Sequence, residues 1–119
     1  TDWNSLVVNT LDADRFRRIF AACCSTFVHA HLPPKLPGML EQAGFQLSAV
    51  ATVPMVSAGK RVDDSFMGNW AFRIVPTKAR GYGLPEEDVQ KWLEEQSSLR
   101  DDSAFFACVH RFLFLARKP

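Results

Sequence analysis

The chain has 119 residues, 47% of them hydrophobic, with ten Phe and three Trp. This composition excludes a disordered segment and suffices for one hydrophobic core. Fourteen Lys and Arg against thirteen Asp and Glu leave a net charge of +1, so the strong positive field typical of proteins that bind nucleic acid or anionic membranes is missing.

The N-terminal part of the chain predicts an extended segment followed by a helix. Residues 1–10 read as an extended segment or loop. Asp12 is a suitable N-cap, because its carboxylate can accept hydrogen bonds from the first turn. The apolar residues that follow recur at steps of three and four, as on one helix face; they are Phe16, Ile19, Phe20, Cys23 and Phe27. Pro33 and Pro34 cannot continue this helix, so we expect it to end near His31.

A second helix and a strand are predicted next. The helix starts between Pro34 and Pro37, and Gly44 suits the left-handed conformation of a C-terminal cap. The strand covers residues 45–56 and alternates only weakly between apolar and polar side chains. Residues 57–64 are polar and contain glycine, which predicts a loop.

Two further helices precede the last strand. The third helix is capped by Asp64 or Ser65 and is expected to be broken by Pro76 and by the glycines at 81 and 83. The fourth begins at Pro85, and three acidic residues in its first turn favour the positive end of the helix dipole. Its predicted inner stripe consists of Val89, Trp92 and Leu93, and it extends to Gln96.

The final strand, residues 104–116, is the longest apolar run of the sequence. Its aromatic and branched residues predict a strand covered on both faces. Residues 45–56 are the one partner that we identify for it, and two strands are too few to shelter so apolar a ribbon. The predicted order is helix-helix-strand-helix-helix-strand, with the two strands about fifty residues apart, which suggests an inserted helical cap over residues 57–103.

Three segments in this order resemble a known family. They are Asp2-Trp3-Asn4-Ser5-Leu6-Val7-Val8, then Leu36-Pro37-Gly38-Met39-Leu40-Glu41-Gln42-Ala43-Gly44-Phe45, and last Trp92 to Leu99 followed by Phe105-Phe106 and Arg111-Phe112-Leu113-Phe114. The first is similar to the segment after the fifth strand of class I S-adenosylmethionine-dependent methyltransferases of the ubiquinone/menaquinone-biosynthesis type. The second is similar to the helix before their sixth strand. The third is similar to their last helix and seventh strand.

The resemblance implies a fold, and it implies that the cofactor-binding half of the domain is absent from this chain. Residues 1–119 would be a single partial domain, the C-terminal part of a Rossmann-like α/β fold that is α+β as an isolated piece. The family binds its cofactor at a glycine-rich turn in the first half, and no Gly-x-Gly-x-x-Gly occurs here. We therefore expect a methyltransferase segment that acts on a small-molecule acceptor, with no S-adenosylmethionine binding and no activity in the chain alone. Thr1 in place of Met also favours a piece of a longer protein.

The family's strand arrangement implies a partner. Its seventh strand lies between the fifth and sixth and pairs antiparallel with the sixth, so one side of strand 104–116 is expected to lack a neighbour. An open apolar edge favours pairing with another chain. We expect a homodimer through this strand. The alternative to an enzyme segment is a non-enzymatic dimeric α+β module that binds an apolar ligand, and a purely structural interaction domain is a third reading.

Six residues are candidates for acceptor binding. Asp2 and Trp3 match positions that look toward the methyl acceptor in the family, where a carboxylate orients the acceptor or takes its proton and an indole stacks on it. A frayed, exposed terminus is the interpretation that we favour for both. Phe66, Trp70, Arg73 and Tyr82 lie in the insert and can line an apolar pocket, with Arg73 binding a carboxylate. Ordinary helix packing explains Phe66 and Trp70 as well.

The histidines and cysteines give weaker signals. His29 and His31 lack further ligands at a convincing spacing, so a helix C-terminus explains them better than a metal. Cys23 falls on the apolar face of its helix and is expected in the core, whereas the role of Cys24 stays open. Three cysteines without a disulfide pattern suit a reducing cytoplasm, and no signal peptide or bilayer-length apolar run is present. We therefore predict a cytoplasmic protein without a membrane partner.

Overall fold

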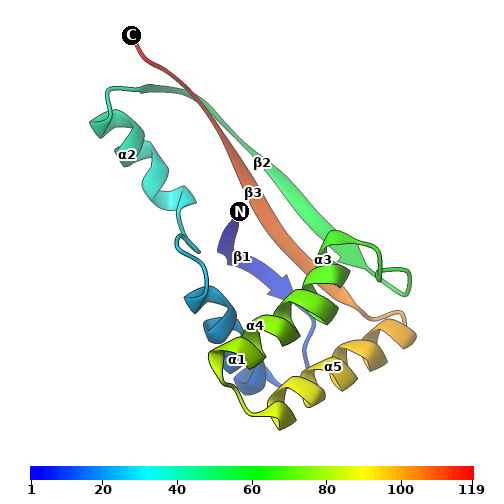
Figure 1. The fold of residues 1–119 in the computed structure, drawn as a ribbon. Coiled ribbons are helices and arrows are strands. Elements are labelled where there is room, and N and C mark those ends of the chain that lie inside the picture. The colour runs from blue at the N-terminus through cyan, green and yellow to red at the C-terminus, as the bar shows by residue number, and fades with distance from the viewer.

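The computed structural model describes all 119 residues and has a mixed α+β fold (Figure 1). Its sheet is antiparallel, with the strand order β1-β3-β2. The strands are β1 (Asp2–Val8), β2 (Gln46–Ala58) and β3 (Phe106–Arg117). The helices are α1 (Ala13–Ser25), α2 (Leu36–Gln42), α3 (Phe66–Asn69), α4 (Val75–Tyr82) and α5 (Glu86–Asp101). A 3₁₀ turn, Pro33–Lys35, leads into α2. None of the helices is both long enough and apolar enough to span a bilayer.

Strand β1 corrects the predicted element order. Residues 1–10 were expected to be a loop or extended segment, but Asp2–Val8 pairs antiparallel with β3, with Asp2 opposite His110 and Val8 opposite Ala107. The final strand therefore has two neighbours over residues 107–110, which corrects the expectation that one of its sides lacks a neighbour, and one neighbour beyond His110. The pairing register shifts between Asp2 and Val7, and such an irregular strand has a weak sequence pattern.

The helix boundaries follow local signals with two exceptions. The side chains of Asp12 and Ser65 cap α1 and α3, and Gly44 and Gly83 adopt positive φ, of 80° and 90°. Helix α1 ends at Ser25, well before His31, because the amide and hydroxyl of Thr26 both donate to the carbonyl of Cys23.

Pro76 does not break the third predicted helix. A π-helical turn, Trp70–Ile74, joins α3 to α4, and the amide of Val75 donates to the carbonyl of Trp70. Pro76 therefore falls in the first turn of α4. A residue in the first turn needs no amide donor, so proline is tolerated there.

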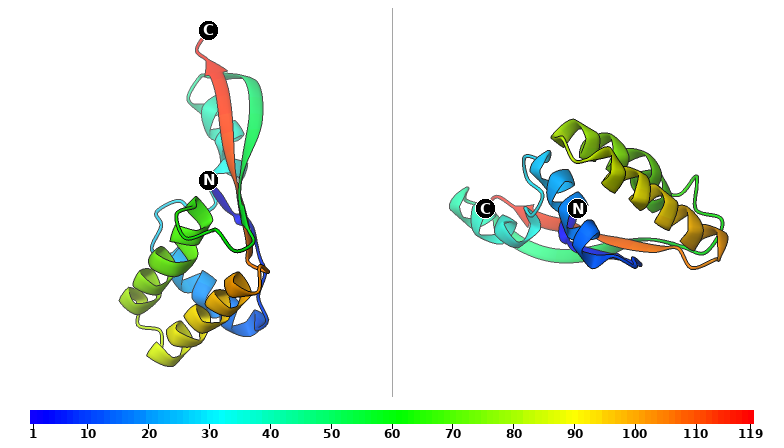
Figure 2. Two further views of the ribbon diagram at one scale, coloured as in Figure 1. Left: turned by 90° about the vertical axis from the view of Figure 1, so that its right-hand side faces the viewer. Right: turned by 90° about the horizontal axis from the view of Figure 1, so that it is seen from below.

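The core lies between one face of the sheet and the helices α1, α3, α4 and α5 (Figure 2). Trp92 is at its centre, fully buried, and its indole nitrogen donates to the carbonyl of Ala71 at 2.9 Å. The ring of Trp70 meets it edge-on, with centroids 6.1 Å apart. Val89 and Gln96 of α5 are also fully buried, as the predicted inner stripe requires. We call this part of the molecule, residues 1–33 and 55–110, the body.

The remaining residues, 34–54 and 111–119, form an arm. Figure 1 shows β2 and β3 running past the helices as a two-stranded ribbon, with α2 beside its far end. None of the arm residues is buried. The molecule is accordingly elongated, with a radius of gyration of 16.7 Å against about 13 to 14 Å for a compact chain of this length.

The expectation that the final strand is covered on both faces is wrong. Helices cover one face of its first half, and none of its residues from 111 to 117 is buried. Ala107 and Val109 are fully buried, but Leu113 and Leu115 are 58% and 66% exposed. The apolar composition of β3 is uniform along its length. Burial differs because the helices of the body cover only the first half.

Candidate functional site

A groove of about 250 Å³ lies where the arm meets the body. On one side are three prolines of the 3₁₀ turn and of α2, and on the other is the ribbon. Phe112 and Phe114 lie two residues apart on β3 and therefore share one face of the sheet. The groove is lined by Asp2, Pro33, Pro34, Pro37, Val50, Phe112 and Phe114. We call it the Asp2 groove, because Asp2 supplies the one ionisable side chain among these residues.

The carboxylate of Asp2 is held in place by contacts of one of its two oxygen atoms with Asn4 and His31. Its Oδ1 atom accepts a hydrogen bond from the backbone amide of Asn4 at 3.0 Å and lies 3.4 Å from Nδ1 of His31. The hydroxyl of Ser5 donates to the carbonyl of Asp2, and the amide of Trp3 donates to the carbonyl of Ala30 at 3.1 Å. The side chain is 10% exposed. The interpretation of Asp2 and Trp3 as a frayed terminus is therefore wrong.

Trp3 and Trp70, two of the predicted acceptor-binding residues, pack against each other. The rings are stacked, with centroids 5.9 Å apart, and Trp3 also stacks on Phe27 at 5.4 Å. Trp70 is only 4% exposed. Helix packing, the alternative that we considered for Trp70, accounts for its position, and the stack anchors the strand that places Asp2.

The other predicted residues lie outside the groove. Phe66 is 41% exposed, with the guanidinium of Arg111 over its ring at 5.0 Å. Tyr82 is 60% exposed and Arg73 is also at the surface. Of the six candidate residues, Asp2 lines the groove, whereas the prolines and the two phenylalanines that line it with Asp2 were not among the candidates. The signal for them was the period of two in β3 and the cluster of prolines after residue 32.

A second hollow lies beside the loop that connects α1 to the 3₁₀ turn. It has a volume of about 260 Å³ and is lined by residues 27–32 and Lys35, including His29 and His31. No group of three or more His, Cys, Asp or Glu side chains is arranged to hold a metal ion.

Cys23 and Cys24 are in surroundings that disfavour the thiolate. Burial, and secondly the neighbouring Cys24, raise the pKa of the Cys23 thiol to about 11. Burial also raises the pKa of Cys24. Because the thiolate is the reactive form, neither residue is suited to nucleophilic catalysis. Cys23 is buried in the core, as its position on the apolar face of α1 predicts.

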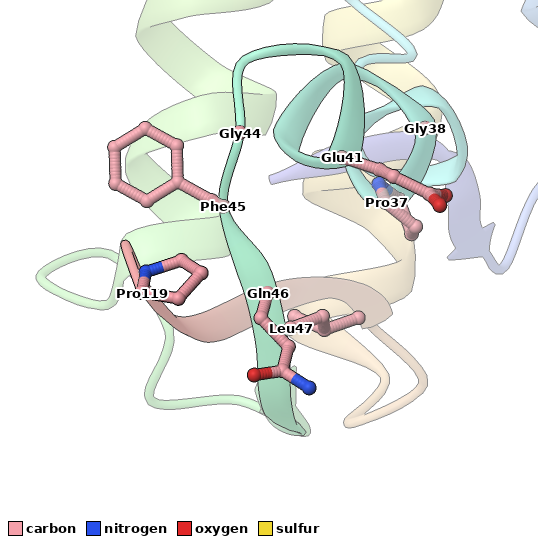
Figure 3. Close-up of a pocket in the computed structure, with 8 residues that line it drawn as sticks. All are labelled: Pro37, Gly38, Glu41, Gly44, Phe45, Gln46, Leu47 and Pro119. Atoms are coloured by element: carbon pink, nitrogen blue, oxygen red, sulfur yellow. The ribbon is translucent and has the colours of Figure 1, made fainter.

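A third hollow, of about 430 Å³, lies at the tip of the arm between α2 and the ends of the ribbon (Figure 3). Figure 3 shows the ring of Phe45 and the carboxylate of Glu41 pointing away from each other. Its side chains do not converge on a common point, as a ligand site requires. The Asp2 groove, with one fixed carboxylate among apolar walls, is the better candidate.

No protein-family model, curated protein or solved structure matches this chain. By its own structure, the chain is a mixed α+β protein with a three-stranded antiparallel sheet.

Proposed function

We propose that this chain is the C-terminal, acceptor-side part of an S-adenosylmethionine-dependent methyltransferase that acts on a small molecule. The observation that carries the proposal is the strand order. In the family that the sequence resembles, the seventh strand lies between the fifth and the sixth and pairs antiparallel with the sixth. Here β3 lies between β1 and β2 and is antiparallel to both. In this proposal β1 is the counterpart of the fifth strand, whereas the sequence resemblance aligned Asp2–Val8 with the segment directly after that strand.

The bare arm supports the same proposal. Strand β1 pairs with Ala107 to His110 of β3, so the same edge of β3 is open from Arg111 to Arg117. The apolar side chains of β2 are exposed along this stretch, as are Leu113 and Leu115 of β3, whereas Phe112 and Phe114 are half-buried. Uncovered apolar surface of this extent is unusual for a chain that functions alone. In the proposed parent domain, the remaining strands and helices of the larger sheet cover it.

The Asp2 groove gives this part a role in the reaction. Its apolar walls exclude water from an acceptor, and the carboxylate of Asp2 hydrogen-bonds to the acceptor or takes its proton. Methyl transfer needs mainly the alignment of acceptor and donor, so a pocket that fixes the acceptor provides much of the rate enhancement. Helices α3, α4 and α5 form the proposed cap between β2 and β3. S-adenosylmethionine would bind to the first half of the parent domain, and we propose that the chain alone is inactive.

The test is the coding sequence immediately upstream of Thr1. A glycine-rich strand-turn-helix within the preceding 100 to 150 residues, roughly one domain's length, is the expected finding. The longer chain should then bind S-adenosylmethionine in a calorimeter, and the chain of residues 1–119 should not. A start codon close to Thr1 would contradict the proposal. Binding of S-adenosylmethionine by residues 1–119 would contradict the statement that the cofactor-binding half lies outside this chain.

A second candidate is a dimeric α+β module that binds an apolar ligand. The exposed ribbon favours it, since a second copy can pair along the open edge of β3 and cover Leu113 and Leu115. Sedimentation equilibrium at micromolar concentration tests it. We expect a dimer that Leu115→Lys dissociates, whereas Leu11→Lys, at an 80% exposed position in the body, leaves it intact. A stable wild-type monomer rules this candidate out.

A further inference from the structure

We infer that the Asp2 groove selects a small apolar amine, bound as its ammonium cation. The inference rests on the proposed function only in naming this amine as the methyl acceptor. The binding selectivity itself follows from the groove.

Charge is the first argument. Asp2 is the one ionisable residue that lines the groove, and no Lys or Arg is among the lining residues. The imidazole of His31 lies 3.4 Å from Oδ1 of Asp2, but His31 lines the second hollow and not the groove. Lys35 lines the second hollow, and the guanidinium of Arg111 lies over Phe66. A carboxylate ligand would face Asp2 without a basic residue among the groove-lining residues to compensate it, whereas an ammonium ion gains a charge-assisted hydrogen bond.

The orientation of Asp2 is the second argument. Its Oδ1 atom is occupied by the amide of Asn4 and the imidazole of His31, whereas Oδ2 accepts no hydrogen bond from the protein. Oδ2 is therefore available to a ligand. Because a carboxylate only accepts hydrogen bonds, the ligand must supply a donor, and an ammonium group supplies up to three.

The walls of the groove are the third argument. Phe112 and Phe114 present aromatic rings, which attract a cation electrostatically and also pack against an apolar ligand body. The volume of about 250 Å³ is just below the range of about 300 to 1,000 Å³ that is usual for ligand pockets, so the groove suits a small molecule, on the order of ten non-hydrogen atoms. An arylalkylamine has this size and both chemical features.

Three probes of one shape test the inference on the chain of residues 1–119. They are 2-phenylethylamine, 2-phenylethanol and phenylacetate, titrated at neutral pH and followed by NMR shifts of the residues that line the groove. The amine should bind about tenfold more tightly than the alcohol, which is the typical gain from a charge-assisted hydrogen bond. The acid should bind least. Equal binding of amine and alcohol, tightest binding of the acid, or no binding of any probe overturns the inference.

Two substitutions locate the selectivity. Asp2→Asn keeps the shape of the side chain and should make the amine and the alcohol equivalent. Val50→Lys places a cation in the groove at a position that is 49% exposed and tolerant of change, so it should reverse the preference in favour of phenylacetate. Val53→Lys is the matched control, since Val53 is 42% exposed on the same strand but does not line the groove. Unchanged selectivity in Val50→Lys contradicts the inference even if Asp2→Asn fails to fold.

This outcome is separable from that of the proposed function. If the groove selects the amine but no cofactor-binding half is encoded upstream, the proposed methyltransferase function is wrong and the inferred amine site stands. If a longer chain binds S-adenosylmethionine but the groove does not distinguish the three probes, only the inferred amine site is wrong.

Discussion

The body and the arm share the strands β2 and β3, and only in the body do helices cover one face of these strands. In the body, β3 has β1 on one side, β2 on the other and helices over one face, and Ala107 and Val109 are fully buried. In the arm, the same strand has one neighbour, and Leu113 and Leu115 are exposed. The residue types are similar in both halves. The cover supplied by the rest of the chain therefore decides burial, and composition alone does not.

The two regions also differ in their electrostatics. The ion pairs of the structure all lie within the body, for example Arg18 with Asp88 and Arg80 with Glu86. The arm contains no ion pair, and residues 44–58, which include all of β2, contain no charged residue. The arm thus depends on its ladder of backbone hydrogen bonds and on apolar contacts that leave much of each side chain in water.

Hydrogen exchange should show the largest difference between the two regions. Amides of residues 107–110, paired within the three-stranded part, should exchange at least about a thousandfold more slowly than those of residues 112–116 in the ribbon. The reason is that a two-stranded ribbon opens locally at little cost, whereas the core amides need global unfolding. Exchange detected by mass spectrometry or NMR measures this. Equal protection of both stretches would show that body and arm unfold as one unit.

Matched truncations should separate the regions next. Trp92→Ala removes a fully buried indole, its hydrogen bond to Ala71 and its contact with Trp70, so we expect a loss of about 3 to 5 kcal/mol in the free energy of unfolding. Leu113→Ala in the arm should cost at most about 0.5 kcal/mol, because its side chain is largely in water already. Urea denaturation measures both. Similar losses would mean that the arm is covered in solution.

A buried carboxylate in the body provides the third comparison. Glu95 is 8% exposed, and its Oε1 atom accepts hydrogen bonds from the amide of Leu11 and from the hydroxyl of Thr10. Glu95→Ala leaves these donors unpaired and removes the anion beside Arg15, so a loss of about 2 to 3 kcal/mol is expected. Gln46→Ala removes an exposed side-chain contact with Arg117 in the arm and should be nearly neutral. A small effect at Glu95 would indicate that water replaces it in the body.

The features that could be predicted from sequence are the local ones. The caps at Asp12 and at Asp64 or Ser65, and Gly44 as a helix terminator, each depend on a few neighbouring residues. The structure has Asp12, Ser65 and Gly44 in these roles. Strand β1 was missed because its partner, β3, lies about a hundred residues away and its own pattern is irregular. The burial of β3 was overestimated for the same reason, since its cover comes from distant segments.

The candidate site shows the same division. Asp2 was singled out because its sequence neighbourhood resembles a family motif. Phe112, Pro33 and Val50 were not, because tertiary packing brings three separate segments to one groove. Conversely, Trp70 was predicted to line a pocket because it lies in an amphipathic helix. An amphipathic pattern does not distinguish an indole that faces a ligand from one that is buried in the core.

The smallest expected effect is a pH dependence that belongs to the body alone. The guanidinium of Arg80, and secondly the amide of Gln90, lower the pKa of Glu86 from its ordinary 4.5 to about 2. A carboxyl group whose pKa is lower in the folded state stabilises the fold above its unfolded value, and this contribution is lost as pH falls from about 4.5 towards 2. The pair joins the end of α4 to the start of α5 and is exposed, so solvent screening keeps the effect small.

Urea unfolding at a series of pH values should show a shallower acid decline for Glu86→Gln than for wild type, and Arg80→Ala should reproduce that shallower curve. An unchanged curve in both variants would mean that this ion pair, like the contacts of the arm, adds nothing measurable to stability.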